Sequence, residues 1–232
     1  MQLGCVFRRL AALSARRLAW LVSGGIVVYV AVDVLLRFLR PGYSLLYNAE
    51  SDYGRGPWYW VMDLNFLLRC ALSLAACLAV RRSAGPDSDV RGGVYLLATW
   101  AVCSGLLAFF ADNPEGTPTT ASGIVHLVLA VIAFACVVIG TILISAGLRS
   151  DPAWRPAATV LLTVALAGAA AFLLLGTAHG HHHAPGGLYE RIFLGLQLLW
   201  IALAAGYAAA RRPEARSSAR LITSSAASGS PG

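Results

Sequence analysis

Residues 40–69 read RPGYSLLYNAESDYGRGPWYWVMDLNFLLR and join a turn-rich loop to the start of a long apolar run. The loop half contains two prolines and three glycines, which favour turns. The apolar half nevertheless carries Asp63, Asn65 and Arg69. If this run crosses a membrane, ionisable groups at that depth are costly and indicate a functional site. Whether this run crosses a membrane is judged from the composition of the rest of the chain.

The composition indicates a lipid bilayer as the solvent. Of the 232 residues 58% are hydrophobic and only 12% are charged, whereas a soluble domain has about 25% charged residues. Only helices and closed barrels satisfy their backbone in lipid, and strand-like alternation is absent. We therefore predict an all-α polytopic membrane protein with six transmembrane helices in one bundle. The expected spans are residues 18–36, 58–80, 94–111, 123–147, 157–176 and 189–210.

The ends of the chain have a different composition from the bundle. Residues 1–17 are basic and are expected to be a cytoplasmic segment, residues 18–210 the membrane domain, and residues 211–232 a disordered cytoplasmic tail. A secretory signal peptide also begins with a basic region, but the first apolar run has about 19 residues and no A-x-A-like site follows it. We therefore interpret this run as the first helix.

Arginine is distributed unevenly between the flanking segments. Thirteen arginines lie in the two termini and in residues 81–93 and 148–156, whereas three lie in the first loop. This asymmetry predicts a cell-membrane protein with both termini in the cytoplasm. The net charge of +7 does not indicate nucleic-acid binding, because no basic face with interleaved aromatic residues is present. The five cysteines form no CxxC pair, and we expect no cofactor.

Polar residues gather toward the outer ends of the predicted helices. Arg69 is the exception, because it lies in the middle of its span. We expect it to point into the bundle and to be bonded either to a carboxylate, with Asp33, Asp63 and Glu190 as the candidates, or to backbone carbonyl groups. The alternative is that its long side chain snorkels to water. The predicted outer pocket comprises Asp33, Asp63, Asn65, Arg69, Asp112, His126, Glu190 and Arg191.

Three function classes remain open at this point. A binding protein for membrane lipid, or for another membrane protein, needs only the outer pocket. A membrane-embedded hydrolase of a lipid ester or amide needs His126 as a general base, a carboxylate such as Asp63 to orient it, and a nucleophile. The serines considered for that role are Ser44, Ser51 and Ser73. A small transporter needs a polar path to the cytoplasm, which the apolar inner halves of the helices disfavour.

The histidine-rich segment between the last two helices is a weak candidate for a metal site. Metal sites need ligands held in a fixed geometry, and a glycine-flanked run does not provide one. We therefore expect no structural metal there. The residues concerned are His179, His181, His182 and His183.

Several short motifs resemble one family. PGYS (41–44) and AESDYGRGPWYWVMDLNF (49–66) are similar to the "P-G-Y-S … I-S-E/D-L-G … N-x-x-F" stretch of prokaryotic membrane proteins of the domain of unknown function 998. GLLAFFADNP (105–114), GIVH (123–126) and GLYERIFLGLQLLW (187–200) also resemble that family. Ala49, Ala111 and Arg69 depart from its usual aliphatic, proline and glycine residues.

This resemblance covers roughly residues 18–210. It implies six helices, a marked outer face and a bacterial inner-membrane location, but no reaction. The six-helix eukaryotic Frag1/DRAM/Sfk1-like proteins share a similar first-loop pattern more remotely. The function expected from the sequence is therefore binding or organising lipid or a partner protein through an acidic outer-leaflet pocket, with no catalytic residue assigned.

Overall fold

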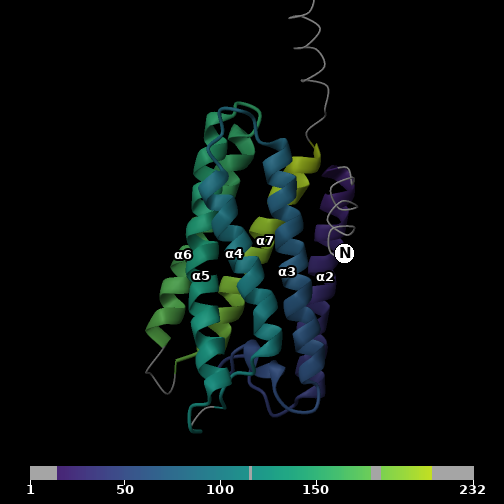
Figure 1. Cartoon of the computed structure of the whole chain (residues 1–232), viewed down its shortest axis with the longest axis vertical. Coiled ribbons are helices and arrows are strands. Elements are labelled where there is room, and N and C mark those ends of the chain that lie inside the picture. Colours follow the sequence, from purple (N-terminus) through teal and green to yellow (C-terminus); the bar gives the residue numbers. More distant parts are fainter. Residues whose placement is uncertain (1–14, 115–116, 179–183, 211–232) are drawn as a thin grey trace, which may run out of the picture.

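The computed structural model describes residues 15–114, 117–178 and 184–210, and within these ranges the chain is a bundle of six long helices without strands (Figure 1). Three short 3-10 turns accompany them: η1 (Ser51–Gly54), η2 (Leu107–Phe109) and η3 (Leu148–Ser150). The all-α prediction with six helices is therefore confirmed. The long helices are α2 (Ala15–Leu39), α3 (Tyr59–Ser83), α4 (Arg91–Leu106), α5 (Ala121–Gly147), α6 (Arg155–Ala178) and α7 (Gly186–Ala210).

All six helices are long and apolar enough to cross a membrane. Their outward surfaces are apolar as well: Phe38, Phe109 and Leu173 are each at least 70% exposed. Water would disfavour so much contiguous apolar surface, whereas acyl chains accept it. The lengths and the outward surfaces together define a polytopic membrane protein.

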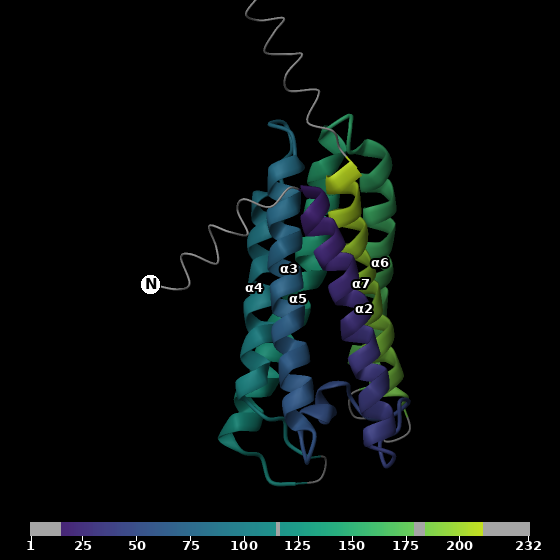
Figure 2. The ribbon, with the colours of Figure 1, turned by 90° about the vertical axis from the view of Figure 1, so that its right-hand side faces the viewer.

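Each helix packs against the next one in the chain, and the last helix, α7, packs against the first, α2, which closes a ring. Figure 2 shows α2 and α7 side by side. α3 and α7 also contact each other across the ring. Of the six neighbouring pairs, α5 and α6 make the least extensive contact. A cavity lies beside this seam and is lined by residues of both helices.

The half of the bundle near the chain termini is tightly packed. Gly93 of α4 lies against α5, where an added Cβ would come within 2.7 Å of the Gly140 carbonyl oxygen. Small residues of this kind let membrane helices approach closely. The buried indoles also have partners: Trp100 Nε1 donates to Ser73 Oγ at 3.0 Å, and Trp200 Nε1 donates to Ser145 Oγ at 3.0 Å. Little room for a ligand remains in this half.

The first loop, residues 40–58, folds over the opposite end of the bundle. Tyr53 is fully buried there and stacks on Tyr43 with ring centroids 5.3 Å apart. The Leu188 amide donates to the Leu46 carbonyl at 3.1 Å, which ties the loop to the start of α7. Gly56 has a φ of +76°, a conformation that glycine adopts without strain. The loop is thus a structured part of the bundle.

Several helix ends differ from the predicted ones by two to five residues. α2 continues to Leu39 because Pro41, which disfavours helix at the residue before it, is the first strong stop signal. The predicted span 94–111 begins earlier as α4 and ends in the tighter turn η2. The Phe110 carbonyl beyond that turn is hydrogen-bonded to His126, a contact that the local sequence does not reveal.

Candidate functional site

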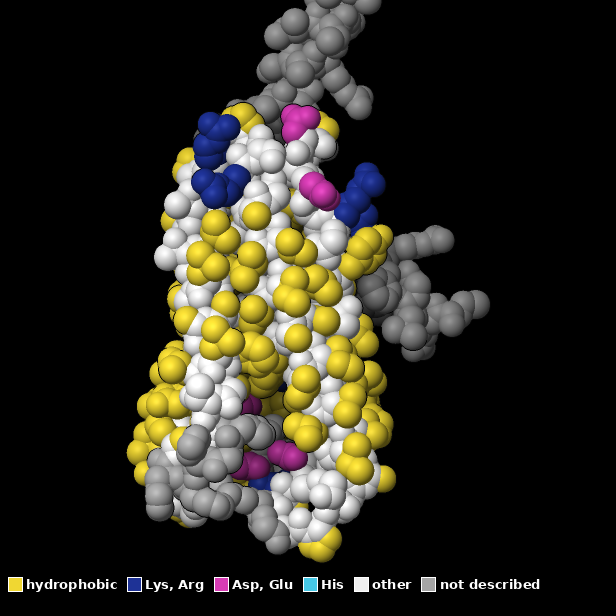
Figure 3. All heavy atoms as spheres, turned by 90° about the vertical axis from the view of Figure 1, so that its left-hand side faces the viewer, with side chains coloured by type: hydrophobic (Ala, Val, Ile, Leu, Met, Phe, Trp, Pro, Cys, Tyr) yellow, Lys and Arg dark blue, Asp and Glu magenta, His cyan; other side chains and the backbone are white. Residues whose placement is uncertain are grey.

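A cavity of about 730 Å³ lies in the loop-side half of the bundle. Side chains of α3, α5, α6 and α7 line it, together with residues 47–52 of the first loop. A space-filling view shows a hollow in that half, with Asp and Glu side chains visible inside it and apolar side chains on both flanks (Figure 3). The volume is that of a typical small-molecule site, about 300–1,000 Å³.

One wall of the cavity is apolar and comes from α5 and α6. Leu127, Val131 and Leu175 line it, and Phe134 and Phe172 continue it toward the middle of the bundle. The Phe134 and Phe172 rings meet edge to face at 6.3 Å between centroids. From residue 126 to residue 134, α5 rises about 12 Å at 1.5 Å per residue. This wall suits a hydrocarbon chain more than a polar solute.

The opposite wall contains a buried hydrogen-bonded chain. Arg69 Nη1 donates to the Tyr29 hydroxyl at 2.9 Å, and that hydroxyl donates to Glu50 Oε1. The Glu50 amide in turn donates to Glu190 Oε2 at 3.1 Å. All four side chains are at least 92% buried. The chain links α3, α2, the first loop and α7, so it fixes the loop on the helices.

Arg69 lies inside the bundle, as expected, with 2% of its surface exposed. None of the expected partners is found: within the described residues its hydrogen bond goes to the Tyr29 hydroxyl, and not to Asp33, Asp63, Glu190 or a backbone carbonyl. Aromatic rings surround the guanidinium instead, with the Trp100 centroid 4.8 Å and the Phe66 centroid 5.2 Å from Cζ. Cation–π contacts of this kind stabilise a desolvated cation. The charge is balanced through Tyr29 by Glu50.

A second group of charges lies in the first loop above the cavity. Asp52 pairs with Arg55 and accepts from Asn48 Nδ2 at 3.4 Å. Burial raises the pKa of Asp52, although the nearby Arg55 opposes the shift. Asp112 lies in the turn that follows η2, and its Oδ2 accepts a hydrogen bond from Ser51 Oγ at 3.5 Å. The part of the cavity lining formed by the first loop and the turn after η2, here called the roof, is therefore polar and predominantly acidic.

His126 lines the cavity and is 4% exposed. Its Nδ1 lies 2.7 Å from the Phe110 carbonyl oxygen, and its ring meets Phe66 edge to face. Within the described residues no carboxylate or hydroxyl is hydrogen-bonded to it. Asp63 lies elsewhere, near Gly54. The triad that a hydrolase would need is thus not assembled.

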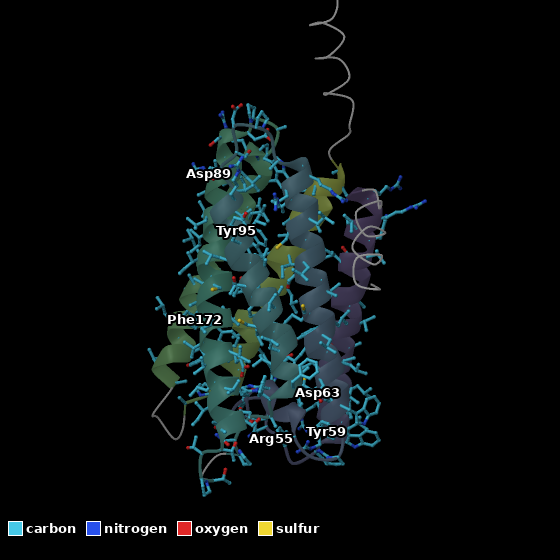
Figure 4. The ribbon with its side chains drawn as sticks, in the orientation of Figure 1. Arg55, Tyr59, Asp63, Asp89, Tyr95 and Phe172 are labelled. Atoms are coloured by element: carbon cyan, nitrogen blue, oxygen red, sulfur yellow. The ribbon has the colours of Figure 1, made fainter. Side chains whose placement is uncertain are left out.

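Only half of the predicted pocket lines the cavity: Arg69, Asp112, His126 and Glu190. Asp33 lies 3.9 Å from Arg191, and Arg191 Nη1 donates to the Asn48 carbonyl at 2.8 Å. Asn65 donates to the Tyr29 carbonyl at 3.3 Å. These residues hold the loop and helices together instead of facing the cavity. Figure 4 shows Asp63 at the loop end with Arg55 and Tyr59, and Asp89 toward the opposite end.

Two central residues, Tyr29 and Glu50, were missed by the sequence analysis. Tyr29 lies in the middle of an apolar helix, where a tyrosine resembles any other large side chain. Glu50 lies in a loop, where an acid is normally solvated. The sequence did contain one signal for a residue such as Tyr29: an arginine within a membrane span, here Arg69, requires a polar partner.

The histidines considered for a metal site, residues 179 and 181–183, lie outside the described residues. Among the described residues, no group of three or more His, Cys, Asp or Glu side chains could hold a metal ion.

The fold and the cavity define a six-helix integral membrane protein with a polar, acidic site in one half of its bundle. The family described as "Protein of unknown function (DUF998)" matches residues 23–207, and the chain belongs to this family. No curated protein and no solved structure matches the chain.

Proposed function

We propose that this protein binds one amphipathic molecule from the membrane in the loop-side cavity. The observation that supports the proposal is the two-sided lining, with hydrocarbon side chains of α5 and α6 facing a wall of buried polar and charged groups. An acyl chain fits the first wall and a polar head the second. The α5–α6 seam, where the ring is least closely packed, is the route for entry from the bilayer.

We further propose that the cavity lies in the outer leaflet of the cell membrane, with both termini in the cytoplasm. The support is the excess of arginine in the termini and in the loops on their side of the bundle. A head group bound near the first loop would then lie at the outer surface, where the bilayer meets water.

Filling the cavity tests the binding function. Gly176 lines the cavity, and a Cβ added there meets nothing within 4 Å. Gly176→Trp should therefore add an indole at the cavity lining, where the new Cβ itself displaces no protein atom. The matched control is Gly195→Trp, because Gly195 also has open space around it but does not line the cavity. Both changes remove a helical glycine.

Native mass spectrometry of the purified chain provides the measurement. We expect the wild type and Gly195→Trp to retain one bound lipid, and Gly176→Trp to lose at least most of it. Equal lipid retention by the two variants would contradict the proposal.

A further inference from the structure

Several donors around the cavity are used by the protein itself, and the exception is the Arg69 guanidinium, whose Nε has no hydrogen-bond partner among the described residues. Arg69 Nη1 donates to Tyr29, Tyr29 donates to Glu50, and the Glu50 amide donates to Glu190. Ser51 donates to Asp112 in the roof. For a head group that must accept hydrogen bonds, these contacts leave the Arg69 guanidinium, whose charge Glu50 already balances through Tyr29.

Two buried side chains that line the cavity present free acceptors. Glu190 is 8% exposed and lines the cavity; its Oε2 takes the Glu50 amide, and no described residue donates to its Oε1. His126 supplies independent evidence. A carbonyl oxygen cannot donate, so the 2.7 Å contact with Phe110 requires that Nδ1 carries the proton. In the neutral ring Nε2 is then an acceptor, and no described residue donates to it.

The charges also favour a cationic occupant. Four carboxyl groups line the cavity, those of Glu50, Asp52, Asp112 and Glu190. Arg69 balances Glu50 through Tyr29, and Arg55 pairs with Asp52. Asp112 and Glu190 form no salt bridge with a described residue, and Arg191 beside Glu190 is engaged by Asp33 and by backbone carbonyl oxygens. A buried carboxylate such as that of Glu190 is costly unless it is paired, so a cation supplied by the ligand would stabilise the site.

We infer that the amphiphile bound in the cavity carries a primary ammonium head group, which donates to Glu190, His126 and Asp112 while its hydrocarbon chain lies against α5 and α6. The inference rests on the proposed binding function and adds the chemical class of the ligand. A carboxylate or phosphate head would place negative charge beside two uncompensated carboxyl groups, and a hydroxyl head would leave their charge unbalanced.

Three probes with the same twelve-carbon chain separate these possibilities: dodecylammonium, dodecanol and dodecanoate. The full chain, stripped of endogenous lipid and held in nanodiscs of a zwitterionic phospholipid, is titrated with each probe. The fraction of protein with one bound probe is read by native mass spectrometry. We expect dodecylammonium to bind at least tenfold more tightly than dodecanol, and dodecanoate more weakly than either.

Variants locate the effect at the site. Glu190→Gln and Asp112→Asn should each weaken dodecylammonium binding about tenfold and leave dodecanol unchanged. Asp89→Asn at the opposite end removes the same charge and should change nothing, which controls for general attraction of a cation to an acidic protein. Asp112 lies in a turn, so its variant remains informative if Glu190→Gln fails to fold.

The outcomes separate amphiphile binding in the cavity from preference for an ammonium head group. If dodecanol binds as tightly as dodecylammonium and Gly176→Trp abolishes both, the cavity binds amphiphiles but the ammonium inference is overturned. If Asp89→Asn weakens binding as much as Glu190→Gln, the attraction is nonspecific and the inference is also overturned. If no probe forms a one-to-one complex that Gly176→Trp removes, the proposed function itself fails.

Discussion

At the scale of single residues, the burial of Arg69 could be predicted from the sequence, but its hydrogen-bond partner could not. An arginine in mid-span predicts burial and a partner, because a lipid-facing charge there is costly. The identity of the partner depends on how α2 and the first loop pack against α3. Tyr29 relays the contact to Glu50, and neither residue is distinguished by its position in the sequence.

The stability of Arg69 variants tests this relay. Arg69→Leu leaves the Glu50 carboxylate buried without its counter-charge, and breaking a buried charge pair costs about 3–5 kcal/mol. We therefore expect a clear loss of thermal stability in detergent, part of which returns in Arg69→Leu/Glu50→Gln. The control is Arg69→Leu/Asp63→Asn, because Asp63 is not hydrogen-bonded to Arg69. Equal recovery in both double variants would show that Glu50 is not the partner.

Asp52 provides a prediction about pH. Burial raises its pKa above the ordinary value of 3.8, so folding favours the protonated form. The stability that protonation contributes is complete below the unfolded pKa and is lost as pH rises through the folded pKa. Asp52→Asn imitates the protonated form and removes this loss. The melting temperature of Asp52→Asn relative to wild type should therefore rise from pH 3.5 to pH 7, and a falling difference would contradict the assignment.

At the scale of elements, hydropathy was sufficient to predict six helices, because each helix is apolar over enough residues to span a bilayer. Hydropathy was insufficient to show that the first loop is a packed element. Its order comes from long-range contacts, such as those of Arg191 with the Asn48 and Leu45 carbonyl oxygens. Contacts between residues more than 140 positions apart leave no local signal.

The junction of this loop with α7 depends on the absence of a side chain at Gly187. A Cβ there would overlap the Asn48 carbonyl, whereas a Cβ at Gly186 would meet only the Ala178 Cβ at 3.6 Å, an ordinary contact. Gly187→Ala should therefore displace the loop at a cost of about 1–3 kcal/mol, and Gly186→Ala should be tolerated. Amide hydrogen exchange in residues 43–53 should increase in the first variant alone. Unchanged exchange in Gly187→Ala would show that the loop does not depend on this contact.

At the scale of the whole molecule, the two halves of the bundle differ in how they are packed. The half near the chain termini is closed by small residues and satisfied indoles, whereas the loop-side half encloses the cavity and most of the buried charge. The sequence indicates this division through the depth at which ionisable residues lie. It does not indicate the volume, which depends on how closely α5 and α6 pack against each other.

The orientation of this asymmetric bundle is a prediction for the membrane itself. Because the basic segments lie at the end with the termini, the loop-side end should face the exterior. In a variant whose five cysteines are replaced by alanine, Thr119→Cys tests the loop-side end and Asp87→Cys tests the opposite end, and both positions are exposed. A membrane-impermeant maleimide added to intact cells should label Thr119→Cys and leave Asp87→Cys unlabelled until the membrane is opened. The reverse pattern would place the cavity in the inner leaflet, and the amphiphile would then enter from the cytoplasmic side.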